Sequence, residues 1–315
     1  MLSREFFGRQ QAGFSLVEIM VALVIGLIVS VVIGQVMSVY GGQKQTTSGT
    51  SDAQTSGTLA LYSIQREIQQ AGYGLPLFDT LNPPLKCNLA DIAMATIAVG
   101  AASDTVTVRY GDSPVAGIPV KMLAGSGGAV ATVDTSIGCK VGDDVLVTKG
   151  AACNLTKVTA LTVSNITLAA ASANVASESS LSCLGTWRTI QFSVNANQLL
   201  RSENGAAGVA IGSQIVALKA QYGLSATPAD NIVNSWSSAA PGDRNLIKAI
   251  RFAVVARSGQ LEKNVVTNAA PVAWVAASAP VIDLSADSNW QRYRYKVFET
   301  IIPMRNMVWS KETLK

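Results

Sequence analysis

One carboxylate, Glu18, lies in an otherwise apolar run that covers residues 14–37 and contains one amide, Gln35. A charged carboxylate is costly inside a membrane helix and usually serves a function there. The carboxylate could instead simply extend to the membrane interface. The physical argument alone leaves both interpretations open.

Four cysteines form a second group of residues with chemical potential. None of them makes a CxxC pair, which argues against a zinc or redox site, and an even number in an exported domain favours two disulfides over buried free thiols. Sequence permits three connectivities. A short separation favours pairing Cys139 with Cys153, which leaves Cys87 to pair with Cys183.

Most enzyme classes find little support in the composition. The chain of 315 residues has no histidine, which excludes Ser-His-Asp and Cys-His catalysis and histidine-ligated metals. We therefore expect no enzyme, no cofactor and no metal site. A net charge of +4 is too mild to indicate nucleic-acid binding. Arg292, Arg294 and Lys296 alternate with apolar residues, which on one strand would give a basic face for a partner or, more simply, a solvated face.

The apolar run is long enough to anchor the chain. As a helix, residues 14–37 would span roughly 36 Å, against about 30 Å for a hydrocarbon core. The run exceeds that of a secretory signal peptide, and no A-x-A cleavage site follows it. Arg4 and Arg9 precede it, so the positive-inside rule predicts a cytoplasmic N-terminus and an exported remainder.

The string Gly13-Phe14-Ser15-Leu16-Val17-Glu18 resembles the type III signal of type IV prepilins and pseudopilins. The resemblance implies that residues 1–13 are a leader, that a membrane aspartyl peptidase cuts after Gly13, and that the new N-terminal Phe14 is N-methylated. It further implies that Glu18 meets the Phe14 amine of a neighbouring subunit. Pairing these charges would relieve the cost of burying either, and would set the axial register of assembly.

Four small residues, Ala22, Gly26, Ser30 and Gly34, recur at intervals of four along the anchor. Such a row allows membrane helices to approach each other closely. Glycine and alanine are also common in membrane helices generally. The row nevertheless favours a packing face.

Helical periodicity continues beyond the anchor, over residues 38–74. Leu61, Ile64, Ile68 and Ala71 form one apolar stripe, and the glycines after it end the helix. We predict one long helix from Phe14 to Ala71, with a weak point at residues 41–50, whose second half packs on a sheet.

The rest of the chain, residues 75–315, alternates like β-strands. Strong candidates are 105–110, 144–148, 157–163, 165–168, 187–194, 214–222 and 248–257. The predicted fold class is α+β and pilin-like: a long N-terminal helix on an antiparallel sheet, with a β-rich insertion between about Cys87 and Cys183.

Segments 64–73, 215–223, 250–258 and 298–309 resemble minor pilins of the PilW type. This resemblance implies a subunit that helps to initiate and assemble a type IV pilus. Its partners would be other minor pilins, the major pilin, the prepilin peptidase/N-methyltransferase and the inner membrane, from which it would pass to the surface pilus. The alternatives are a J-type pseudopilin of type II secretion, and a tip adhesin or DNA-uptake pilin that uses the middle region.

Overall fold

A computed structural model describes residues 13–77, 86–87, 89–115, 117–274, 280 and 282–308. The chain divides into two compact units, Met1–Ser48 and Gly49–Lys315. Helix α1 spans Leu16–Gln70, and its residues up to Ser48 make up the described part of the first unit apart from 13–15. The sequence prediction of one long helix is confirmed, to within two residues at its start and one at its end.

The predicted weak point at residues 41–50 is wrong, because helix α1 continues through it. Threonine side chains explain part of this outcome. The Thr46 hydroxyl donates to the Gly42 carbonyl at 3.1 Å, and Thr55 and Thr58 make the same bond one turn back. Polar side chains in this segment thus bond along the helix and do not divert the backbone into turns.

In the second unit, the last turns of α1 bury one side. Ala53, Ala60, Ile64, Ile68 and Ala71 are buried, and Leu61 packs against the same core. The helix ends two residues before Gly72, which has a φ of +76° and donates its amide to the Arg109 carbonyl. A side chain at Gly72 would also collide with Met94. Both the positive φ and the lack of space therefore favour glycine at this position.

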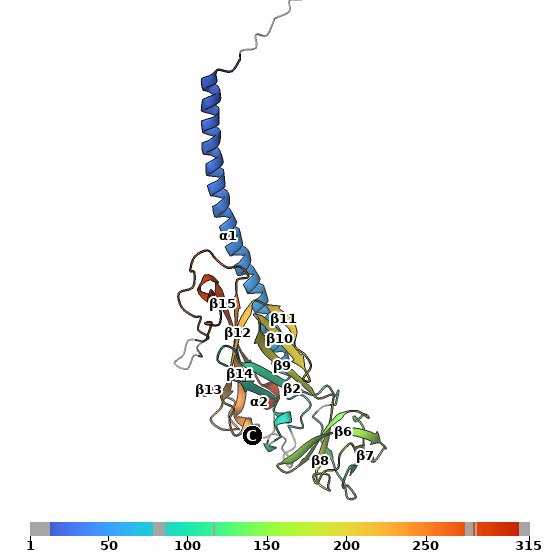
Figure 1. The fold of residues 1–315 in the computed structure, drawn as a ribbon. Helices are drawn as coiled ribbons and strands as arrows, with labels where there is room; N and C mark the ends of the chain where they lie inside the picture. The colour runs from blue at the N-terminus through green and yellow to red at the C-terminus, as the bar shows by residue number, and fades with distance from the viewer. Residues whose placement is uncertain are drawn as a thin grey trace, which may run out of the picture. The chain divides into compact units, whose positions relative to one another are not determined.

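Two antiparallel sheets share this core with α1 (Figure 1). The first has the order β1-β2-β9-β10-β11, and the second has the order β13-β12-β14-β15. The strands of the first sheet are β1 Ala95–Ala98, β2 Thr105–Tyr110, β9 Arg188–Asn195, β10 Gln198–Glu203 and β11 Val209–Ser213. Those of the second are β12 Ile215–Leu224, β13 Ser235–Ser237, β14 Ile247–Arg257 and β15 Tyr295–Pro303. Short helical turns are η2 Ala90–Ile92, η3 Arg244–Leu246, η4 Trp290–Arg292 and α2 Arg305–Val308.

A third sheet of six strands has its own apolar core, centred on residues such as Val145, Ile166 and Leu181. Its order is β3-β8-β5-β6-β7-β4, from β3 Val120–Lys121, β4 Val130–Thr132, β5 Asp144–Lys149, β6 Ala152–Leu161, β7 Asn165–Leu168 and β8 Ser180–Gly185. This sheet is the predicted β-rich insertion, but it is narrower than expected. β1 and β2 fall inside the predicted limits, yet β2 pairs with β9 and so belongs to the first sheet.

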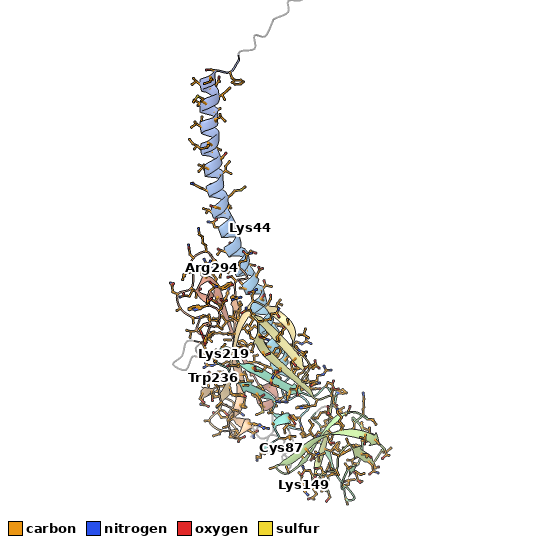
Figure 2. The ribbon with its side chains drawn as sticks, viewed as in Figure 1. Lys44, Cys87, Lys149, Lys219, Trp236 and Arg294 are labelled. Carbon is orange, nitrogen blue, oxygen red and sulfur yellow. A yellow bond between two sulfur atoms is a disulfide. The ribbon has the colours of Figure 1, made fainter. Side chains whose placement is uncertain are left out.

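The second sheet is covered on both faces. β14 is buried along nearly its whole length, and a second cluster that includes Trp274 and Leu284 packs on the face away from α1. Arg251 is held there between the rings of Trp236 and Trp274, 4.6 and 4.4 Å from their centres. Buried Lys219 on β12 pairs with Asp104 at 3.3 Å. Figure 2 labels Lys219 and Trp236 beside this sheet, and labels Lys149 in the third.

All seven predicted strands are present, with shifts of a few residues at most except β6, which starts five residues earlier. The predicted strand that would align three basic residues is wrong. Arg292 ends the turn η4, whose backbone bonds run from Arg292 to Asn289 and from Tyr293 to Trp290, and β15 begins only at Tyr295. Arg294 pairs with Glu262, so no single basic face forms from these residues.

Two disulfides are present, as predicted, but the favoured pairing is wrong. Cys87 joins Cys153, and Cys139 joins Cys183. Strand order explains the correction, because β6 and β8 lie on opposite sides of β5 and their cysteines enter different cores. Cys153 packs against the core that contains Cys87, whereas Cys139 packs against the core that contains Cys183. One bridge therefore closes the third sheet on itself, and the other ties it to the main core.

Candidate assembly site

The residues of the predicted processing and assembly site lie at the start of helix α1. Phe14 precedes helix α1 and is 78% exposed, and Glu18 is an exposed residue of the first turn, where a negative charge suits the helix dipole. Apart from Gly13, the predicted leader 1–13 lies outside the described residues. Among the described residues no cation forms an ion pair with Glu18.

The apolar part of α1 has an 18-residue window of mean hydropathy 3.0 in which no side chain is buried. By length and composition the helix can cross a membrane, and a signal sequence near an N-terminus would share these properties. Lipid and other apolar helices are the surroundings that suit such a surface.

The four small residues lie along this exposed helix. A methyl group added at Gly26 or Gly34 would meet no atom within 4 Å, so no contact inside the described chain requires glycine there. The Ser30 hydroxyl donates to the Gly26 carbonyl at 2.8 Å, which satisfies it without a partner helix. All four residues of the row are exposed on the described helix.

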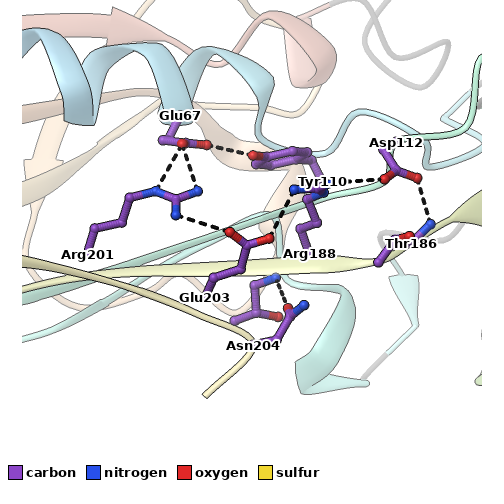
Figure 3. Close-up of polar contacts among 9 residues, drawn as sticks. Glu67, Tyr110, Asp112, Thr186, Arg188, Arg201, Glu203 and Asn204 are labelled. Atoms are coloured by element: carbon purple, nitrogen blue, oxygen red, sulfur yellow. Dashed lines mark hydrogen bonds and ion pairs between the residues drawn. The ribbon is translucent and has the colours of Figure 1, made fainter. Parts of the chain in front are cut away.

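A network of charged side chains ties α1 to the first sheet (Figure 3). Tyr110 donates to Glu67 of α1 at 2.7 Å, and Arg201 on β10 pairs with the same carboxylate at 3.2 Å. Arg201 also pairs with Glu203, which pairs in turn with Arg188 on β9. Burial, followed by the bond to Glu67, raises the pKa of Tyr110 to about 12. The phenol therefore stays neutral and donates at physiological pH.

The network continues to the junction with the third sheet. Arg188 pairs with Asp112, the second residue after β2, at 3.2 Å. Asp112 also accepts a 2.7 Å bond from the Thr186 amide, where the chain returns from β8 to β9. Burial alone would raise the pKa of Asp112, but these two bonds outweigh it and lower that pKa. Asp112 thus clamps both crossings between the first and third sheets.

Sequence reasoning missed this network because its members are far apart in the chain. Glu67, Asp112 and Arg201 belong to no recognisable sequence motif. From the sequence alone, each is expected to be an ordinary charged surface residue. The pairing depends on β2, β9 and β10 lying side by side beneath α1, which only the sheet order reveals.

Comparisons with known proteins match both ends of the chain. Residues 8–34 match the prokaryotic N-terminal methylation motif, which covers the Gly13–Phe14 junction and Glu18. A long apolar helix, an antiparallel sheet covered by that helix and this motif are the features expected of a type IV pilin-like protein. Residues 171–306, from before β8 to α2, match the family described as Type IV Pilus-assembly protein W. The chain is thus similar to PilW-type pilus-assembly proteins over residues 171–306, and it carries the methylation motif near its N-terminus.

One similar solved structure is a type IV-like pilin from Thermus thermophilus, with 11% identity and a TM-score of 0.37. The similarity covers 79% of this chain and 95% of that one. No curated protein matches the chain. The predicted segments 215–223 and 250–258 lie within the PilW match, whereas β1 to β7 and most of α1 lie outside both matches.

Proposed function

We propose that this chain is a minor pilin that helps to initiate and assemble a type IV pilus. The observation that carries the proposal is the presence in one chain of the methylation motif at residues 8–34 and the PilW match at residues 171–306. Its role is assembly and not catalysis. Its partners are the other minor pilins and the major pilin. Before assembly it resides in the inner membrane, with its second unit on the periplasmic side.

The exposed helix supports the steps of this proposal. The peptidase removes residues 1–13 and methylates Phe14, whose amine then meets Glu18 of a neighbour in the filament. The strip formed by Ala22, Gly26, Ser30 and Gly34 receives a neighbouring helix, since nothing in the described chain occupies it.

Processing gives one direct prediction. Intact-mass analysis of the membrane-extracted protein should find a chain that begins at Phe14 and carries one methyl group. A Gly13→Val variant should keep the leader, because a branched side chain at the cleavage position obstructs the peptidase. A wild-type chain that still begins at Met1, or that begins beyond Gln35, would contradict the proposal.

Deletion of the gene tests the role in assembly. Surface pili should fall to a small fraction of the wild-type number and recover on complementation, while the level of major pilin in membranes stays constant. Purified pili should contain this chain in trace amounts relative to the major pilin. Normal piliation together with a loss of type II secretion would assign the chain to a pseudopilus instead.

A further inference from the structure

A cavity of about 370 Å³ opens between the first and second sheets and the turn η3. Its wall is mostly apolar and is formed by Ala90, Ala93, Met94, Ala95, Thr96, Tyr222, Ala240, Pro241, Gly242, Ile247, Met304 and Met307. Two arginines, Arg109 on β2 and Arg244 in η3, complete the lining. A volume of this size is typical of a small-molecule site with a few polar groups in an apolar wall.

Each arginine is held in place by one of its nitrogens. The Nη1 of Arg109 donates to the Ala93 carbonyl at 3.1 Å, and the Nη1 of Arg244 donates to the Cys87 and Leu89 carbonyls, both at 3.2 Å. Within the described part of the chain, the Nε and Nη2 groups of both side chains have no acceptor. Each guanidinium group is thus held in place while its Nε and Nη2 donors remain available for hydrogen bonds. An arginine edge with two such N–H donors is the one that binds a carboxylate.

The charges of the two arginines are not matched by an ion pair among the described residues. No described carboxylate lies within ion-pair distance of either side chain. Burial lowers the pKa of Arg109, the exposed Asp91 raises it, and the nearby Arg244 lowers it again. Asp243, next in the chain to Arg244, instead accepts bonds from Asn245. Two like charges that share one apolar cavity are stabilised by an anion between them.

We propose that this cavity binds a carboxylate attached to an apolar or aromatic group, with Arg109 and Arg244 on the carboxylate and the methionines around the apolar part. One carboxylate has two oxygens to match two guanidinium edges, and the wall offers few donors for a phosphate. The carboxylate could belong to a free organic acid or to the end of a peptide chain. The cavity does not involve the residues of the proposed N-terminal assembly chemistry. A negative binding result would therefore leave the proposed function unaffected.

The test uses the full processed chain in nanodiscs of a neutral lipid, with empty nanodiscs as the reference. Ligand-observed NMR titrations compare 3-phenylpropionate, as a free acid, with N-acetylphenylalanine, as a chain end. N-acetylphenylalanine amide matches the latter except for its charge. We expect saturable binding of at least one acid and about tenfold weaker binding of the amide, since hydrogen bonds to charged groups contribute most of the selectivity. Stronger binding of the chain-end probe than of 3-phenylpropionate would identify a peptide terminus as the source.

Variants localise the binding. Arg244→Gln should weaken acid binding about tenfold, Arg244→Lys should weaken it less, and Arg294→Gln, outside the cavity, should leave it unchanged. Equal affinity for the acid and its amide would overturn the proposal, as would no saturable binding of either acid to the wild-type chain. The comparison of acid with amide needs only the wild-type protein, so the test stands even if an arginine variant fails to fold.

Discussion

Glu18→Ala is expected to leave this chain in the membrane, folded in its second unit, but to reduce its amount in sheared filaments by about tenfold or more. Removal of the carboxylate makes the helix more apolar, so membrane insertion should not suffer. The sheets and their disulfides are built from residues of the second unit, so they should form in the variant as in the wild type. What is lost is the partner for the Phe14 amine of a neighbouring subunit, which would then be buried without compensation.

Matched variants separate the charge from the shape of this side chain. Glu18→Gln should also be depleted from filaments, though less, because a hydrogen bond can survive without the charge. Val17→Ala, one residue away and on an equally exposed position, should enter filaments normally. The measurement is the ratio of filament-bound to membrane-bound protein by quantitative mass spectrometry. If Glu18→Ala reaches filaments as well as wild type does, Glu18 only extends to the interface and does not set the register.

Removal of either disulfide should destabilise the second unit by a large amount. The bridges span 66 and 44 residues, and the chain-entropy relation gives about 4 kcal/mol for each. The variants Cys87→Ala/Cys153→Ala and Cys139→Ala/Cys183→Ala should therefore each show a strongly lowered denaturant midpoint. The second pair should first loosen the third sheet, since its bridge lies inside that sheet's own core.

Thiol titration of the denatured variants tests the connectivity directly. Each of the two double variants above should have no free thiol. Cys139→Ala/Cys153→Ala should instead expose two, because it removes one partner from each bridge. The opposite pattern would restore the pairing that the short separation of Cys139 and Cys153 favours, and would contradict the structure.

Local features of the chain were predictable because their cause is local. The stripe Ile64, Ile68 and Ala71 repeats with the helical period, and the strand at residues 105–110 alternates with a period of two, so each element follows from its own side chains. Sequence also predicted the end of α1, because glycines after an apolar stripe terminate helices. The match of residues 8–34 to the methylation motif has a related reason, since that motif is a short linear segment.

The wrong disulfide pairing and the overly wide insertion share one cause, which is that both depend on the order of the strands. The disulfide pairing was wrong because β5 separates β6 from β8, and no distance along the chain reveals that. The predicted limits of the insertion were too wide, because β2 lies within them but pairs with β9 of the first sheet. Arg292 was predicted on a strand because the alternation of basic and apolar residues does not reveal the backbone hydrogen bonds that form the turn η4.

By itself, then, the sequence determined the long helix, its apolar first part and most strands, each encoded in a contiguous stretch of side chains. Only the tertiary structure brought Glu67 to Tyr110 and Arg201, and Arg109 to the cavity that Arg244 shares. These residues come from distant segments, and their chemistry depends on burial and on which charges face each other. Both quantities exist only once the sheets have paired and packed beneath α1.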